Sequence, residues 1–203
     1  MEFTTSTALA TIDLDAIRHN YAYAKSLAPN SKTMAMVKAD AYGHGVLPVA
    51  IALAEIGVDG LGVATFPVAV KIRQSGIGVD PLLVLQGAQN EESWQLAKLY
   101  KIQLMVQNDV QLGYVLSDNW PASHKVFVKV DTGMHRMGLE PQKLREALPA
   151  LLNKFGSDGF VICSHFACSD EVGLPFNEEQ LRVLHESISG HIGIQWSIAN
   201  SSA

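Results

Sequence analysis

A lysine at the end of a short apolar run is the first residue whose position suggests chemistry. The run spans residues 34–38, and acidic, aromatic, glycine and histidine residues follow it at once. Met34, Met36 and Lys38 would share one face of a strand, because strand side chains alternate. A lysine on such a face is unfavourable unless its amine is neutralised or bonded. Lys38 therefore either extends past the strand end into water or provides a desolvated amine that can form a Schiff base.

Further polar side chains follow other apolar runs, at the ends of later strands. These residues are Lys129, Asp131, Thr132, Arg136, Ser164, His165, Asn200, Ser201 and Ser202. In a barrel of parallel strands such positions converge on one mouth, where active sites lie. A lysine, a tyrosine, an arginine, a histidine and a phosphate-suited serine loop are together typical of a pyridoxal phosphate pocket. That cofactor needs a Schiff-base lysine, a phosphate cradle and a group that tunes its ring.

Each of these residues also has a structural interpretation. Lys129 and Asp131 share a strand face and could form a buried ion pair. Arg136 could make a surface salt bridge, although a fixed fork of donors in a glycine-containing loop also suits a carboxylate or phenolate. His165 could be a hydrogen-bonded core residue. Asn200 and the serines after it could cap a helix.

Apolar residues switch between strand-like and helical spacing along the chain. The sequence predicts strands over residues 34–38, 60–66, 81–85, 102–106, 125–130, 160–166 and 193–199. It predicts helices over residues 14–27, 46–56, 67–76, 91–100, 109–116 and 141–155, and a further helix that starts at Asn177. In that last helix, Gln180 is placed for a capping box.

Alternation of apolar strands with helices indicates a parallel sheet covered by helices. The sheet could be open and doubly wound, with a ligand at its switch point, or closed as a TIM-type (β/α) barrel. The glycine pattern of a dinucleotide site is absent after the first strand, where AYGHG stands. Seven strand units, the last without its helix, favour an α/β barrel that has seven of its eight strands.

Composition narrows the class of protein. The chain has 203 residues, 48% of them hydrophobic, and a formal charge of −5 without basic blocks, which argues against nucleic-acid and anionic-membrane partners. Cys163 and Cys168 do not form a zinc pattern, so no metal is expected, and a structural disulfide is not expected either. With no signal peptide or membrane span recognisable, a cytoplasmic location is expected.

Four segments resemble the alanine racemases, which are fold-type III pyridoxal phosphate enzymes. They are MVKADAYGHG (36–45), VKVDTGMHRMG (128–138), SHFACSDE (164–171) and IANSSA (198–203). The segment ATIDLDAIRHN (10–20) is also similar, and the matches follow the family's order over almost the whole chain. The resemblance implies that residues 1–203 form one PLP-binding (β/α) barrel domain of the alanine racemase type.

The resemblance also implies roles for individual residues. Lys38 would carry pyridoxal 5'-phosphate as an aldimine and act as one of two catalytic bases. Tyr42 and Ser201 would contact the phosphate. His165 would lie against the cofactor ring, with Asn200 belonging to its support.

Two further roles concern the loop after residue 128. Arg136 would bond the phenolic oxygen of the cofactor and help to hold the substrate carboxylate, which makes it catalytic together with Lys38 and His165. Lys129 matches a lysine that is often carbamylated. The negative charge of N-carboxylysine would hold Arg136, which overturns the ion-pair interpretation of Lys129 if the modification occurs here.

Full-length members of the family continue into an eighth strand and a C-terminal β-domain that this sequence lacks. That part supplies the arginine facing the pyridine nitrogen and a tyrosine that is the second base, contributed across a homodimer. The chain is therefore expected to be a barrel truncated at its C-terminal end, with little or no activity alone. The implied reaction interconverts L-alanine and D-alanine, a small amino-acid substrate, and supplies D-alanine for peptidoglycan.

Three other functions stay open at this point. The chain could be a non-catalytic barrel that binds pyridoxal phosphate. It could be a related racemase or decarboxylase of the same fold type that acts on another amino acid. It could also be a barrel that binds a phosphorylated metabolite without a Schiff base.

Overall fold

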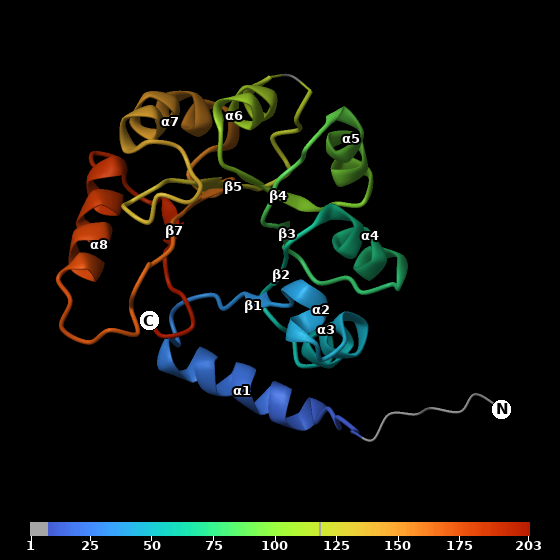
Figure 1. Ribbon diagram of the computed structural model, residues 1–203. Helices are drawn as coiled ribbons and strands as arrows, with labels where there is room; N and C mark the ends of the chain where they lie inside the picture. Colours follow the sequence, from blue (N-terminus) through green and yellow to red (C-terminus); the bar gives the residue numbers. More distant parts are fainter. Residues whose placement is uncertain (1–7, 118) are drawn as a thin grey trace. The chain divides into compact units, whose positions relative to one another are not determined.

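A computed structural model describes residues 8–117 and 119–203, and its contacts divide the chain into two compact units. The first unit is Met1–Leu82 and the second is Leu83–Ala203. In both units short parallel strands alternate with helices (Figure 1).

The first unit contains two complete strands and four helices among its described residues. They are α1 (Leu14–Leu27), β1 (Ala35–Met36), α2 (Lys38–Tyr42), α3 (Val46–Glu55), β2 (Leu61–Val63) and α4 (Phe66–Gln74). Strand β1 pairs in parallel with β2, with Ala35 opposite Leu61. Leu61 also donates its N–H to the carbonyl of Pro81 at 2.9 Å, so β2 is bonded on both sides.

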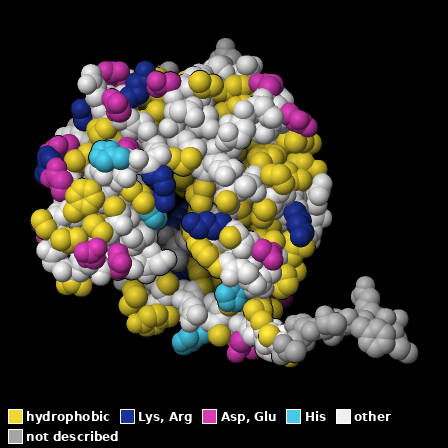
Figure 2. Space-filling view, in the orientation of Figure 1, with side chains coloured by type: hydrophobic (Ala, Val, Ile, Leu, Met, Phe, Trp, Pro, Cys, Tyr) yellow, Lys and Arg dark blue, Asp and Glu magenta, His cyan; other side chains and the backbone are white. Residues whose placement is uncertain are grey.

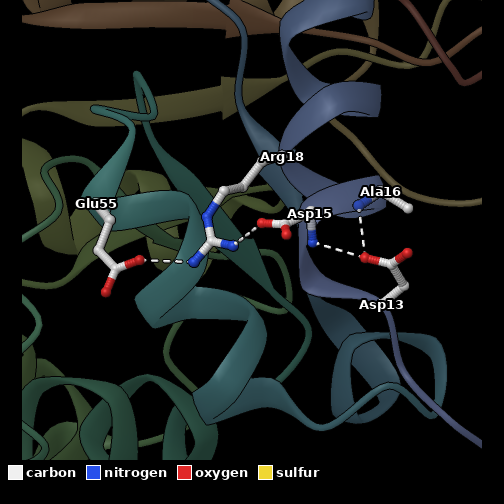
Figure 3. Close-up of polar contacts among 5 residues, drawn as sticks. All are labelled: Asp13, Asp15, Ala16, Arg18 and Glu55. Atoms are coloured by element: carbon white, nitrogen blue, oxygen red, sulfur yellow. Dashed lines mark hydrogen bonds and ion pairs between the residues drawn. The ribbon is translucent and has the colours of Figure 1, made fainter.

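Helix α1 begins at a capped residue and packs against α3. Asp13 Oδ1 accepts the N–H groups of Asp15 and Ala16 at 2.9 and 3.0 Å, which satisfies two donors of the first turn. Arg18 bridges Asp15 and Glu55 at 2.7 Å each (Figure 3). Because both carboxylates are exposed, this bridge adds little stability, and packing between α1 and α3 holds the pair together.

Asp59 joins α1 to the segments that precede β1 and β2. Its carboxylate accepts Lys25 Nζ at 2.6 Å and the N–H of Thr33 at 2.9 Å. Its own N–H donates to the hydroxyl of the buried Tyr21 at 2.9 Å. The hydrogen bond from Lys25 is the main reason that the pKa of Asp59 is lowered. This cluster ties α1 to the starts of β1 and β2.

The second unit continues the same alternation. Its elements are β3 (Leu82–Val84), which crosses the boundary, α5 (Glu91–Leu99), β4 (Gln103–Val106), α6 (Asp109–Leu116), β5 (Val126–Lys129), α7 (Pro141–Phe155), β6 (Phe160–Cys163), α8 (Phe176–Ser187) and β7 (Gln195–Ser197). Strands β3 to β7 pair in parallel in sequence order. The helices lie along one side of these strands (Figure 1).

Strands β5 and β6 are buried on both faces. Val126, Val128, Phe160 and Ile162 are fully buried on one face. The alternate residues Phe127, Val161 and Cys163 are less than a tenth exposed. Helix α7 contributes an apolar stripe at helical spacing, formed by Leu144, Ala147, Leu148 and Leu151. Burial on both faces explains why these strands read as continuous apolar runs rather than alternating ones.

Acidic and basic side chains are dispersed among apolar ones on the face drawn in Figure 2. This agrees with a sequence that carries 15 basic and 20 acidic residues without blocks of either. Among the described residues, no helix is long and apolar enough to cross a membrane.

The predicted helices agree better with the structure than the predicted strands do. Helices α1, α6 and α7 have the predicted bounds. The strands are shorter, and the run predicted over residues 34–38 is reduced to Ala35–Met36. An apolar run also includes residues beyond the strand itself and so overstates strand length. Val37 is buried and still donates its N–H to the carbonyl of Gly62 in β2 at 2.8 Å, but the chain enters α2 at the next residue.

The capping box predicted for the helix after residue 176 is wrong. Helix α8 begins at Phe176 after Pro175, and no side chain caps it. Gln180 is instead fully buried, and its amide bonds other segments. A buried amide must find partners, and here the partners lie outside the helix.

Candidate active site

Lys38 follows β1 but does not lie on the strand. The sequence placed it on the apolar face of a longer strand, whereas the structure places it at the start of α2 with an exposed side chain. Its Nζ lies 5.9 Å from the ring centroid of Tyr42. Among the described residues, no carboxylate lies within 4 Å of Lys38 Nζ. The amine is therefore accessible to a reactant, which is the property that a Schiff-base lysine needs.

The backbone after Lys38 forms a left-handed turn. Ala39, Asp40, Ala41 and Tyr42 have φ of 50, 55, 53 and 55°, a region that residues other than glycine seldom adopt. The turn closes through hydrogen bonds from Gly43, His44 and Gly45 to carbonyls inside it. Such a run reverses the chain directly behind the lysine and brings the tyrosine ring back toward it.

Asp40 connects this turn to helix α3. Its Oδ1 accepts the N–H of Val46 at 2.8 Å, and its carbonyl accepts the N–H of Gly45 at 2.9 Å. The carboxylate thus satisfies a donor at the start of α3, where negative charge is favoured. Sequence reasoning did not assign Asp40 a role, because its spacing from Val46 matches no standard cap.

In the second unit, the ends of β5 and β6 enclose a small hollow. The hollow is too narrow to hold a water molecule, and it is lined by Lys129, Val130, Asp131, Met134, Arg136, Met137, Ser164 and His165. Three of the residues singled out in the sequence, Lys129, Arg136 and His165, are therefore neighbours in this unit. Their common feature is a position at or just beyond a strand's C-terminal end.

The loop that carries Arg136 is closed by strand-like bonds at its base. Leu139 donates its N–H to the carbonyl of Lys129 at 2.8 Å, and its own carbonyl accepts the N–H of Asp131 at 2.9 Å. Asp131 Oδ1 accepts the N–H groups of Gly133 and His135, each at 3.0 Å. The loop is thus shaped by the Asp131 carboxylate, while the Arg136 side chain stays exposed.

The ion pair considered between Lys129 and Asp131 is not found among the described residues. Asp131 instead lies 3.2 Å from His135 Nδ1. Burial opposes ionisation of Asp131, but the backbone donors of Gly133 and His135 outweigh it and lower its pKa. Asp131 therefore serves the loop rather than the lysine.

Lys129 lies in surroundings that disfavour its ammonium form. Burial is the main cause of its lowered pKa, and the nearby Arg136 lowers it further, while Cys163 and Asp131 act in the opposite direction. Burial raises the pKa of the Cys163 thiol to about 12. Because that thiol is neutral at physiological pH, it supplies no anion to stabilise the Lys129 ammonium, and the pKa of Lys129 remains lowered.

The segment that contains His165 is fixed by a buried amide. Gln180 Oε1 accepts the N–H of Ala167 at 2.9 Å, and Gln180 Nε2 donates to the carbonyl of His165 at 3.0 Å. The same Nε2 lies 3.2 Å from Thr132 Oγ1, which is bonded to Ser164 Oγ at 2.7 Å. These contacts join the ends of β5 and β6, and the sequence had not indicated them.

Asn200 holds the other side of this segment. Its Nδ2 donates to the carbonyl of Phe166 at 3.2 Å, and its Oδ1 accepts the hydroxyl of Ser169 and the N–H of Ser202. The helix cap considered for Asn200 is thus replaced by a link between the loops after β6 and β7. Ser201 is exposed in the turn that follows β7.

A second hollow, with a volume of about 620 Å³, lies at the surface of the first unit. Arg18 and Lys25 line it, but both are paired, with Glu55 and Asp59 respectively. Size alone does not make it the candidate site, because it collects no group arranged for chemistry. Among the described residues, no cluster of histidine, cysteine and acidic side chains could hold a metal ion, and both cysteines are free thiols.

Comparison with known proteins connects these features. The family model for the alanine racemase N-terminal domain matches residues 12–203. The chain belongs to the alanine racemase family. The biosynthetic alanine racemase of Pseudomonas aeruginosa is 38% identical over 198 residues, which are 96% of this chain and 54% of that protein. The alanine racemase of Thioalkalivibrio sulfidiphilus is 39% identical over 97% of this chain and 54% of its own length.

Solved alanine racemase structures share the fold. The crystal structure of the biosynthetic enzyme from Pseudomonas aeruginosa matches 95% of this chain with a TM-score of 0.86 and 36% identity, and is 53% covered. The structure from Acinetobacter baumannii has a TM-score of 0.85 at 32% identity, with 95% and 56% coverage. The predicted fold class, an α/β barrel of TIM type with seven of its eight strands, is confirmed. The chain spans about half the length of the curated alanine racemases it matches.

Proposed function

We propose that this chain is the cofactor-carrying part of an enzyme that interconverts L-alanine and D-alanine with pyridoxal 5'-phosphate. The observation that carries the proposal is the family match over residues 12–203, in which Lys38 presents an accessible amine directly after a strand. The same proposal includes a small amino-acid substrate and the supply of D-alanine for peptidoglycan. It also includes a homodimer of the complete enzyme and a cytoplasmic location.

The chemistry of the residues fits this cofactor. Pyridoxal phosphate carries an aldehyde, and the exposed amine of Lys38 can condense with it. Tyr42, on the same turn, has a half-exposed ring and a hydroxyl suited to a phosphate oxygen. When bound, the cofactor withdraws electrons from the substrate α-carbon and so stabilises the charge left by proton removal.

Within this proposal, each residue has a separate task. Lys38 removes the α-proton on one face of the substrate or returns it there. Arg136 directs its fork of N–H donors at the phenolic oxygen of the cofactor and the substrate carboxylate. His165 lies against the ring of the cofactor. Ser201 bonds the phosphate, and Asn200 supports the segment that carries His165.

Lys129 is proposed to carry a carbamate. Its buried amine has a lowered pKa, and the neutral amine is the form that attacks carbon dioxide. The nitrogen bonds to the carbon of carbon dioxide and a proton is released, which leaves a carboxylate on the side chain. This change would turn repulsion between Lys129 and Arg136 into attraction and hold the arginine fork in place. Intact-mass measurement with and without bicarbonate tests it, and equal masses would count against the carbamate.

Racemisation also needs a proton-transferring group on the opposite face of the α-carbon. The family resemblance assigns it to a tyrosine in the part of the relatives that this chain does not match. We expect Lys38 to support exchange of the α-proton of L-alanine with deuterated water, whereas conversion to D-alanine requires the second group as well. L-to-D conversion at the rate of α-proton exchange would refute this single-base expectation.

Covalent capture tests the cofactor assignment directly. The chain is incubated with pyridoxal phosphate, reduced with borohydride, digested and analysed by mass spectrometry. A pyridoxyl group on the peptide that contains Lys38 is expected. The Lys38→Ala variant should lose that adduct, while a Lys32→Ala variant, which removes another exposed lysine of the first unit, should keep it. No adduct at saturating cofactor would refute the assignment.

A non-catalytic cofactor-binding barrel is the second candidate, since an accessible Lys38 amine suits cofactor binding with or without turnover. The two candidates share the Lys38 adduct and differ in turnover. α-Proton exchange that depends on Lys38 supports the enzyme, whereas an adduct without any exchange supports a binding protein. Rates on several amino acids separate an alanine racemase from a related enzyme with another substrate.

A further inference from the structure

Gln180 is a polar residue in the core of the second unit whose side chain makes no bond within its own helix. It is fully buried, and the contacts of its amide reach three positions on two loops. It accepts from Ala167 and donates to the His165 carbonyl in the loop after β6, and it reaches Thr132 in the loop after β5. Burying a glutamine loses side-chain entropy and requires that both ends of the amide be satisfied. Here the amide oxygen and the amide nitrogen of Gln180 both bond backbone groups of the loop after β6.

The hydrogen bonds of Gln180 continue through Thr132 to Ser164, at the end of the neighbouring strand. Thr132, which is 3% exposed, passes the connection on to Ser164 through its hydroxyl. The backbone of the next residues continues the pairing beside β7, since Ser164 donates to the carbonyl of Ser197 in β7 and Phe166 donates to that of Ile198 directly after it. His165 therefore lies between two residues whose N–H groups are bonded to the 197–198 segment, and its own carbonyl accepts from Gln180. The backbone around His165 is thus held at several points, which restricts where its ring can lie.

A second buried glutamine repeats this arrangement two strands earlier. Gln111 on α6 is 5% exposed, accepts the N–H of Gln107 after β4 at 3.0 Å, and donates to the carbonyl of Ala88 after β3 at 3.0 Å. Each glutamine thus joins the loop that precedes its own helix to the loop of the preceding strand. The loop held by Gln111 contains none of the residues proposed for the site, so Gln111 is a matched control of the same type and burial.

We propose that Gln180 is a positioning residue for the cofactor site, which holds His165 and the end of β5 in the geometry that the cofactor ring requires. The inference rests on the proposed function, because His165 matters only if a cofactor ring lies against it. Gln180 itself touches neither cofactor nor substrate. Its effect is exerted through the backbone of the segment from Ser164 to Ala167, which its amide bonds directly.

The test compares Gln180→Met with Gln111→Met in the otherwise intact chain. Methionine keeps the length of the side chain and removes every hydrogen bond. Two readouts are measured: the amide hydrogen exchange of Ala167 without cofactor, and the affinity and absorbance maximum of pyridoxal phosphate bound to Lys38. Gln180→Met should speed exchange at Ala167 by about tenfold or more, since a bonded N–H loses its acceptor. It should also weaken cofactor binding by about tenfold and move the absorbance maximum.

The control separates positioning from general destabilisation. Gln111→Met should lower overall stability by a similar amount and leave Ala167 exchange and the cofactor absorbance as in the unsubstituted chain. Equal changes in both variants, or unchanged readouts in Gln180→Met, would overturn the proposal. If Gln180→Met gives no folded protein, Thr132→Val decides, because it keeps shape and removes one link. Weaker cofactor binding in Thr132→Val than in Gln111→Met then supports positioning, and binding no weaker than the control overturns it.

Failure of the proposed function would look different. If the unsubstituted chain formed no adduct at Lys38, the cofactor assignment would fall and the cofactor readouts would be absent in all variants. Exchange at Ala167 needs no cofactor and would still decide whether Gln180 holds the segment that carries His165.

Discussion

Replacing Gly138 by alanine should destabilise the second unit strongly. Gly138 has φ of 130°, outside the range that other residues readily adopt, which costs on the order of 1–3 kcal/mol. A Cβ there would lie 2.7 Å from the nitrogen of Asp131 and 2.8 Å from the carbonyl carbon of Val130. Both atoms belong to the bonded base of the Arg136 loop, so they cannot move freely, and overpacking adds about 1–3 kcal/mol. The sum is a loss of about 2–6 kcal/mol in the free energy of unfolding.

Two other glycines of the same unit serve as controls for the backbone contribution. Gly190 has φ of 82° but open space where a Cβ would be, so Gly190→Ala should cost about 1–2 kcal/mol from the backbone alone. Gly113 lies in α6 with open space and an ordinary φ, so Gly113→Ala should stabilise by about 0.5–1 kcal/mol. The expected order of stability is Gly113→Ala, unsubstituted chain, Gly190→Ala, Gly138→Ala.

Urea unfolding followed by tryptophan fluorescence measures these differences, because Trp94 and Trp120 are both buried in the second unit. Far-ultraviolet circular dichroism should give the same transition if unfolding is two-state. The reasoning is refuted if Gly138→Ala falls within about 0.5 kcal/mol of Gly190→Ala, a gap at the scale of ordinary surface changes. That result would mean that the base of the loop yields to a methyl group.

Three further outcomes are expected. Because the pKa of Asp131 is lowered in the folded state, its ionised carboxylate stabilises the fold at neutral pH, and this stabilisation is lost as pH falls below about 4. In denaturant titrations, the free energy of unfolding should therefore fall less between neutral and acid pH for Asp131→Asn than for the unsubstituted chain. In buffer freed of carbon dioxide, Lys129→Met should be more stable than the unsubstituted chain at neutral pH, with the gap closing as pH rises toward about 10; a gap that widens contradicts a lowered pKa. Asn90→Ala should cost about 1 kcal/mol in urea unfolding, because Asn90 Oδ1 accepts the N–H of Ser93 at 2.9 Å at the start of α5; no loss would show that the cap is dispensable.

Helix bounds were predictable where local signals agree. Helix α1 has Asp13 as a cap and a clear apolar spacing, and α7 begins with Pro141, which suits the first turn. These signals act within a few residues of the helix end, so all of them can be recognised in the sequence. Strand ends depend on which neighbour supplies the next hydrogen bond, and apolar composition does not record that.

The residues of the candidate site could be predicted from the sequence, but the residues that hold them in place could not. Position at strand ends was enough to select Lys129, Arg136 and His165, which line one hollow of the second unit. The role of Gln180 depends on partners 13 to 48 residues away, and a local pattern suggested a capping box instead. The exposed placement of Lys38 was missed for a similar reason, since no sequence rule predicts four left-handed residues without glycine.

The left-handed turn also changes how the short motif around the lysine should be understood. Positions 39–42 hold two alanines, an aspartate and a tyrosine, none of them β-branched, and Gly43 ends the turn with φ of 86°. A valine or isoleucine at any of these four positions would be a severe backbone outlier. The residue types at positions 39–42 are therefore constrained in part by the backbone conformation of the turn, and not only by reactivity. A library of variants over this stretch should first select for residues that tolerate the backbone, and only among those for residues that tolerate the cofactor.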